Sequence, residues 1–201
     1  MTKFMPQRIG ILGGTFNPIH IGHLAMAQTA LEQGRLDLVY FVPCYTPPHK
    51  RMVKLVSARD RLAMVRQAVQ GNPGFMVSDC EVVRQGKSYS VDTARYFQDR
   101  FPKAKLFWIV GADSFQQLPA WKAIDEISKI VTFIAVNRPG YRSPRSKFSH
   151  ITVTMPGIDI ASSYLRGELA RGKTIKYLVP DKVIRYIGAM RIKITCNCCT
   201  I

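Results

Sequence analysis

The sequence predicts an α/β protein built on a doubly wound parallel sheet. Short, wholly apolar runs of strand length alternate along the chain with longer segments whose apolar residues recur at helical spacing. Loops rich in glycine, proline and polar residues follow several of the apolar runs. In a sheet of this kind ligands bind beyond the carboxyl ends of the strands, so these loops are where a functional site is expected.

The first strand and helix are expected close to the N-terminus. Ile9 to Leu12 is an apolar run typical of a buried parallel strand, and Gly13-Gly14 is expected to end it. Apolar residues then recur at helical spacing from His20 to Gln33, and Gly34 is expected to stop the helix. A strand, a glycine turn and a helix are thus predicted in immediate succession.

A second strand and helix follow. The apolar run over 37–43 predicts a buried strand, which leads into a proline-rich loop over 43–51. Ser57 and Asp60 have the spacing of a capping box, which predicts the start of a helix. Asn72-Pro73-Gly74 is expected to end that helix.

The remaining elements continue the alternation. Residues 75–83 predict a strand region, although Ser78 and Asp79 interrupt its apolar pattern, and Ser90 is expected to cap a helix over 91–101. The other apolar runs and helical patterns predict strands over 105–110 and 130–136, an edge strand over 151–155, short helical turns around Trp121, and helices over 162–170 and 181–190.

The composition is that of a folded globular protein. Of the 201 residues 47% are hydrophobic, and this length suits a single domain, expected to cover 1–190. Residues 191–201 hold three of the five cysteines and are expected to be an unstructured tail. No disulfide framework or zinc-type spacing is present, so a reducing compartment and no protein-bound metal are expected. Without a membrane-spanning run or a signal peptide, a cytoplasmic location is expected and a membrane partner is not.

The net charge of +16 predicts a polyanionic partner. Ten of these units fall in residues 101–201, and no acidic residue occurs between Glu126 and Asp159. Such a balance favours nucleotides, nucleic acid or acidic surfaces, and a solvated basic face is the alternative explanation.

The loop after the first strand has the features of a phosphate cradle. Gly13-Gly14 lets the backbone pass close to a ligand, and the free N–H groups and dipole at the start of the next helix favour an anion. His20 and His23 stand three residues apart, so their rings can converge on the same phosphate oxygens. The alternative is an ordinary tight turn with two surface histidines.

Several polar residues follow other predicted strands. Lys50 ends the proline-rich loop, Asp92-Thr93 lies at a predicted helix start, and Trp121 lies in a segment too broken for a core helix. Ser162-Ser163, with Arg166 one turn later, forms a second candidate phosphate clamp at a helix N-terminus. The structural alternatives are a solvated lysine, two ordinary helix caps and a core indole.

Together these motifs resemble those of one enzyme family. Gly13 to His23 is similar to the G-G-T-F-D-P-x-H-x-G-H signature of the nucleotidyltransferase superfamily. The motifs that occur in the order found in bacterial nicotinate mononucleotide adenylyltransferases are Gly13–His23, Pro47-Pro48-His49-Lys50, Tyr89–Thr93, Gly111-Ala112-Asp113-Ser114, Trp121 and Ser162–Arg166. The resemblance spans residues 8 to 188 and implies a Rossmann-like nucleotidyltransferase fold.

The resemblance implies a reaction and a set of site residues. ATP, carried with Mg²⁺, and nicotinate mononucleotide would give nicotinate adenine dinucleotide and pyrophosphate, without a protein nucleophile. The catalytic residues implied are His20, His23, Lys50 and Arg166. ATP would be bound by Gly13, Gly14, Thr15, Phe16, Gly111, Asp113, Ser162 and Ser163. The mononucleotide would be bound by Asp92, Thr93, Trp121 and Arg138, with Thr93 and its neighbouring amides at the nicotinate carboxylate and Trp121 against the ring.

The chain departs from the family pattern at two places. Asn17 stands where the family most often has Asp, and Ile160-Ala161 precedes the serine pair where the pattern is Ile-Ser. Neither departure removes a phosphate contact.

Three alternative interpretations are weighed against this resemblance. A sister adenylyl- or cytidylyltransferase would share the histidines and the serine clamp. A nucleic-acid-binding protein would explain the charge, but its interleaved surface aromatics and basic helical stripe are absent, so a nucleic-acid partner is not expected. A catalytically inactive relative conflicts with the intact histidines. The oligomeric state, monomer or homo-oligomer, is left open by the sequence.

Overall fold

The fold is organised by one six-stranded parallel sheet, as the sequence predicts. The computed structural model describes residues 5–48, 55–138 and 146–192. The strand order is β3-β2-β1-β4-β5-β6, and every neighbouring pair is parallel. The tail expected over 191–201 falls almost entirely on residues outside these ranges.

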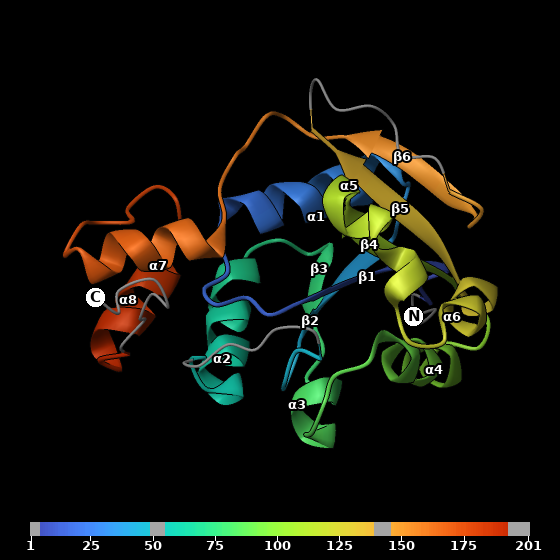
Figure 1. Ribbon diagram of the computed structural model, residues 1–201, viewed down its shortest axis with the longest axis horizontal. Coiled ribbons are helices and arrows are strands. Elements are labelled where there is room, and N and C mark those ends of the chain that lie inside the picture. The colour runs from blue at the N-terminus through green and yellow to red at the C-terminus, as the bar shows by residue number, and fades with distance from the viewer. Residues whose placement is uncertain (1–4, 49–54, 139–145, 193–201) are drawn as a thin grey trace.

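Helices connect each strand from β1 to β5 with the next one, whereas β5 and β6 have no helix between them among the described residues (Figure 1). The strands are β1 (Arg8–Gly14), β2 (Leu38–Pro43), β3 (Phe75–Val77), β4 (Lys105–Gly111), β5 (Val131–Asn137) and β6 (His150–Thr154). The helices are α1 (Ile21–Gln33), α2 (Ala58–Val69), α3 (Cys80–Arg84), α4 (Ser90–Arg100), α5 (Ala112–Gln116), α6 (Ile124–Ile130), α7 (Ser162–Ala170) and α8 (Asp181–Ala189), with the 3₁₀ turn η1 at Leu118–Ala120.

Both faces of the sheet are covered, which explains its wholly apolar strands. Successive side chains of a strand point to opposite faces. In β4, Phe107 and Ile109 join the core formed with α1, α2, α7 and α8, whereas Leu106, Trp108 and Val110 join the core formed with α4, α5 and α6. Figure 1 shows α7 and α8 beside α2 at one end of the molecule, and α4 with α6 at the other.

Several predicted boundaries need correction. Residues 80–84 form helix α3 instead of continuing the strand, which ends at Val77. β1 runs on through Gly13-Gly14, because both glycines still pair with β2. Helix α4 begins at Ser90 itself, with Tyr89 in the cap position.

The order of the strands creates the site. β1 lies between β2 and β4, so the chain winds toward one edge of the sheet from β1 to β3 and toward the other edge from β4 to β6. The loops that leave β1 and β4 therefore diverge above the sheet and leave a crevice at its carboxyl edge.

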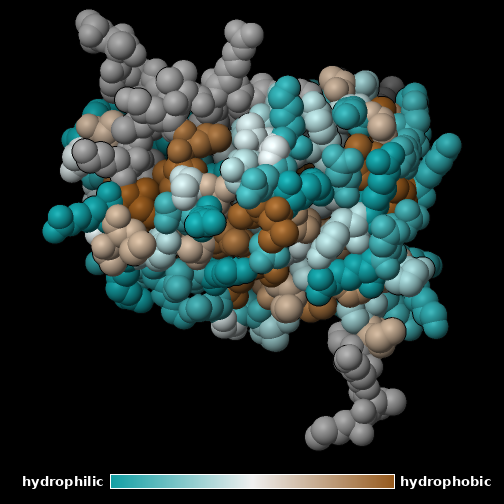
Figure 2. Space-filling model, turned by 90° about the horizontal axis from the view of Figure 1, so that it is seen from below, coloured by the Kyte–Doolittle hydropathy of each residue, from teal (hydrophilic) through white to brown (hydrophobic). Residues whose placement is uncertain are grey.

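The surface is mixed in character. Figure 2 shows hydrophobic residues in separate areas among hydrophilic ones on the face that it presents. Over the described ranges, no helix combines the length and apolar character needed to cross a membrane.

Candidate active site

A cavity of about 730 Å³ opens at the carboxyl edge of the sheet. One side, here called the phosphate side, is formed by the loop after β1, the start of α1, Arg138 after β5 and the start of α7. The opposite side, here called the acceptor side, is formed by the α3–α4 connection and the segment after η1. Among the predicted site residues, the lining includes Gly13, Gly14, Thr15, Phe16, His20, His23, Gly111, Asp113, Trp121, Arg138, Ser162, Ser163 and Arg166.

The loop after β1 is shaped by one close contact. A Cβ on Gly14 would lie 2.8 Å from the ring of Phe16, so no other residue fits there without displacing that ring. Phe16 adopts a left-handed backbone with φ of 48° and is buried. Its ring and the His23 ring form a T-shaped pair with a centroid distance of 5.0 Å. The aromatic contact thus supports both the loop and a histidine.

His20 and His23 converge as their spacing predicts. Their ring centroids are 3.7 Å apart, and the backbone N–H of His20 donates to Nδ1 of His23 at 3.3 Å. Because His23 Nδ1 accepts this bond, its proton is assigned to Nε2. Both rings lie at the N-terminus of α1, where free N–H groups favour an anion.

His20 is a neutral imidazole at physiological pH. Burial and, to a smaller extent, the positive charge of Arg138 together lower the pKa of His20 from 6.5 to about 4. Nδ1 of His20 has no hydrogen-bond partner among the described residues. A neutral ring can donate one hydrogen bond to a phosphate without carrying a buried charge.

The start of α7 is bonded to the loop after β1, across most of the chain. Ser162 Oγ donates to the carbonyl of Pro18 at 3.0 Å, and Arg166 Nη1 donates to the carbonyl of Asn17 at 3.0 Å. Both amide atoms of the Asn17 side chain, which is 2% exposed, and Nε of Arg166 lack partners within the described ranges. Buried polar groups are rarely left unpaired, so this cluster is suited to a polar ligand.

Residues that follow β4 and β5 complete the lining of the cavity. Gly111 caps the short helix α5, and Asp113 lies in its first turn at the cavity. Arg138 follows β5, and its Nη1 is 2.7 Å from Oδ1 of the exposed Asp159. Arg138 therefore faces the cavity while paired at the surface.

On the acceptor side, Trp121 lies where the sequence predicts a stacking indole. It lines the cavity and packs edge-on against Trp108, with ring centroids 5.9 Å apart. Tyr89, the first residue of the Tyr89–Thr93 motif, and Lys122, which the sequence analysis did not single out, lie beside it. Tyr89 lines the same wall, and Nζ of Lys122 is 4.1 Å from the centroid of its ring.

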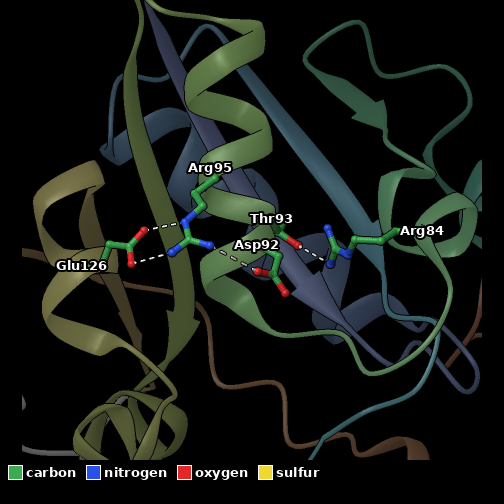
Figure 3. Close-up of polar contacts among 5 residues, drawn as sticks. All are labelled: Arg84, Asp92, Thr93, Arg95 and Glu126. Atoms are coloured by element: carbon green, nitrogen blue, oxygen red, sulfur yellow. Dashed lines mark hydrogen bonds and ion pairs between the residues drawn. The ribbon is translucent and has the colours of Figure 1, made fainter.

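The structure does not bring Asp92 or Thr93 to the cavity wall. Thr93 is 0% exposed, and its hydroxyl donates to Oε1 of Glu81 at 2.5 Å. Nη2 of Arg84 donates to the same hydroxyl at 3.3 Å, and Asp92 is directed to Arg95, as Figure 3 shows. The residues at this helix start that do line the cavity are Tyr89 and Ser90.

Glu81 is a site residue that sequence reasoning missed. It is buried at the cavity wall, and burial raises the pKa of its carboxyl group, against hydrogen bonds from Thr93 and Ser88 and the charge of Arg84, which act to lower it. The residue lies in a segment predicted as a strand. On helix α3, Glu81 instead faces Thr93, which a strand over 75–83 does not predict.

The predicted roles of Lys50 and the expected absence of a protein-bound metal remain predictions. Lys50 lies outside the described residues. Within the described ranges, His, Cys, Asp and Glu side chains form no cluster of three or more that would hold a metal ion.

Comparisons with known proteins show which family the chain belongs to. Residues 11–168 match the cytidylyltransferase-like family. A probable nicotinate-nucleotide adenylyltransferase of Shouchella clausii is 44% identical over 90% of this chain and 94% of its own length. A protein of the same name from Citrifermentans bemidjiense is 43% identical over 92% of this chain and 98% of its own length.

A solved structure has the same fold. Plasmodium falciparum nicotinic acid mononucleotide adenylyltransferase, complexed with NaAD, superposes with a TM-score of 0.79 over 93% of this chain and 97% of that chain, at 19% identity. At this identity the likeness establishes the architecture. The identity to the bacterial proteins and the family match establish more: the chain belongs to the nicotinate-nucleotide adenylyltransferase family, within the cytidylyltransferase-like nucleotidyltransferases.

Proposed function

We propose that this protein transfers the adenylyl group of ATP to nicotinate mononucleotide, forming nicotinate adenine dinucleotide and releasing pyrophosphate. The observation that carries the proposal is that one cavity has both a phosphate side and an acceptor side with an aromatic ring. His20, His23 and the start of α7 face the cavity opposite Trp121. Relatives above 40% identity are named for this activity.

The reaction proceeds by alignment and charge stabilisation. The phosphate of the mononucleotide attacks the α-phosphorus of ATP, and the bond to the β-phosphate oxygen breaks. His20 and His23 donate hydrogen bonds to the phosphates, and Arg166 with Ser163 holds the β and γ end. The backbone of Gly13 to Phe16 and the residues Gly111 and Asp113 hold the nucleotide.

ATP enters as its Mg²⁺ complex. Mg²⁺ keeps most of its ligands as water and phosphate oxygens, so it does not require a cage of protein carboxylates. The donors that line the phosphate side are histidine, serine and arginine groups and backbone amides, which suit a metal carried by the substrate. When bound, the ion neutralises charge on the departing pyrophosphate.

The acceptor is held on the opposite side. The indole of Trp121 stacks on the pyridine ring, and the free amides at the start of α4 receive its carboxylate. Because the Thr93 hydroxyl is bonded to Glu81, its role is to support this helix start, and Asp92 stays directed to Arg95. Arg138 and Lys50 supply positive charge for the mononucleotide phosphate.

A panel of acceptors tests the proposal. Pyrophosphate release is measured with ATP and, in turn, nicotinate mononucleotide, nicotinamide mononucleotide, phosphopantetheine and glycerol 3-phosphate. We expect kcat/KM for the nicotinate compound to exceed that for its amide by about 10² or more, because a carboxamide would press N–H donors against the amides of α4. Equal values would overturn the acceptor site, and release with only another acceptor would identify a sister transferase.

A further inference from the structure

Among the described residues, the most deeply buried charged side chain contacts two loops that border the active site. Arg61, on α2, is 1% exposed, and within the described residues no carboxylate forms an ion pair with it. A buried charge is costly unless it is fully hydrogen-bonded, and an apolar residue of similar size usually stabilises a core as well or better. Stability alone therefore does not account for an arginine here.

The guanidinium of Arg61 joins the two loops that border the cavity. Nη1 donates to the carbonyl of Thr15 at 2.7 Å, in the loop after β1, and Nη2 donates to the carbonyl of Tyr45 at 2.8 Å, in the loop after β2. Nε donates to the carbonyl of Val56 at 3.0 Å, and Nη1 also lies 3.7 Å from Sγ of Cys44. The guanidinium group thus donates hydrogen bonds to three separate backbone segments.

The connection continues to the acceptor side. The backbone N–H of Tyr45 donates to Oγ of Ser88 at 2.9 Å, and the N–H of Ser88 donates to the carbonyl of Thr46 at 2.9 Å. Ser88 precedes Ser90, the first residue of α4, by two positions. A continuous polar path therefore runs from the phosphate loop through Arg61 to the start of α4.

We propose that Arg61 is a positioning residue, which fixes the distance between the ATP subsite and the acceptor subsite without touching either substrate. This inference rests on the proposed function, because an in-line transfer between two bound substrates depends on their mutual alignment. Lysine keeps the charge but offers a single ammonium group, which cannot reach the carbonyls of Thr15, Tyr45 and Val56 with one planar fork.

The test compares Arg61→Lys with Arg66→Lys. Arg66 lies on the same helix, but its side chain is 56% exposed and is paired with Asp79 at the surface. Steady-state kinetics with ATP and nicotinate mononucleotide are combined with calorimetric titration of ATP, whose stoichiometry counts the folded sites. We expect Arg61→Lys to lower kcat per site by about 10- to 100-fold while the Kd for ATP stays within about threefold. Arg66→Lys is expected to match the unmodified protein.

Two results would overturn the inference. One is a kcat per site within about threefold of the unmodified enzyme, and the other is a loss of ATP affinity as large as the loss of kcat/KM. If Arg61→Lys does not fold, Ser88→Ala breaks the same path at Tyr45, and an unchanged kcat per site there would also overturn it. The activity of the unmodified protein distinguishes the two proposals. If it releases no pyrophosphate, the proposed function is wrong. If it does so and the Arg61→Lys variant is equally active, only the role of Arg61 is wrong.

Discussion

The two sides of the cavity are built in different ways. The phosphate side is made largely of backbone groups and helix starts, with His20 in the cap position of α1 and His23 in its first turn. The acceptor side depends on side chains whose directions are set by a buried carboxyl group, since Glu81 holds the hydroxyl of Thr93 away from the cavity. A short motif is therefore sufficient to place the first side, but the second requires knowledge of the packing behind it.

The two sides differ in how far apart in the sequence their interacting residues lie. Residues three apart at a helix start meet whatever the rest of the fold does. The direction of Thr93, in contrast, depends on a helix twelve residues earlier in the chain. In the proposed site, the acceptor side is therefore supported by a buried polar network, where each member is costly to leave unpaired.

The largest effect is expected on the phosphate side. His20→Asn and His23→Asn should each lower kcat by about 10² to 10³, or about 2.7–4 kcal/mol, because each removes a donor aimed at developing charge. The Kd for nicotinate mononucleotide should change little, which is measured by titration of the inactive variants. Glu32→Gln, at an exposed position of α1, is the control. Near-normal turnover in both histidine variants would remove the catalytic role from this side.

The buried, neutral state of His20 should make the stability of the protein depend on pH. Its folded-state pKa of about 4 lies below the unfolded value of 6.5, so the unfolded chain takes up this proton first as the pH falls. The free energy of unfolding should therefore decrease from pH 6.5 toward pH 4, by about 3 kcal/mol from this group. Urea denaturation of the unmodified protein and of His20→Asn gives the difference. Parallel stability curves for the two proteins would mean that His20 is not held neutral by burial.

A smaller effect is expected on the acceptor side. If Thr93 acts through Glu81, Thr93→Val and Glu81→Gln should each lower kcat/KM for nicotinate mononucleotide by about tenfold, and the double variant should be little worse than either one. Thr93→Ser keeps the hydroxyl and should retain activity, while ATP affinity should not change in any variant. Additive losses would show that Thr93 contacts the acceptor independently of Glu81.

The fold was predictable because its signals are local and repeated. The apolar run at 105–110 and the capping residue Ser57, whose Oγ accepts from the N–H of Asp60 at 3.1 Å, are both found as expected. The structure of residues 75–83 was not predicted, because a strand of three residues and a helix of five are each too short to show a strand or helix periodicity. Arg61 carries no local signal at all, since nothing in a helical pattern distinguishes a buried arginine from a solvated one.

The bonds between α7 and the loop after β1 have a consequence for synthesis of the chain. Ser162 and Arg166 are 144 positions from Pro18 and 149 from Asn17, respectively, so these contacts form only after most of the protein has been made. Contacts this distant in sequence form late in folding. A nascent chain or a fragment that ends before α7 has the glycine loop and both histidines but not the clamp. If the clamp holds the triphosphate as proposed, such incomplete chains are expected to bind ATP more weakly than the finished protein.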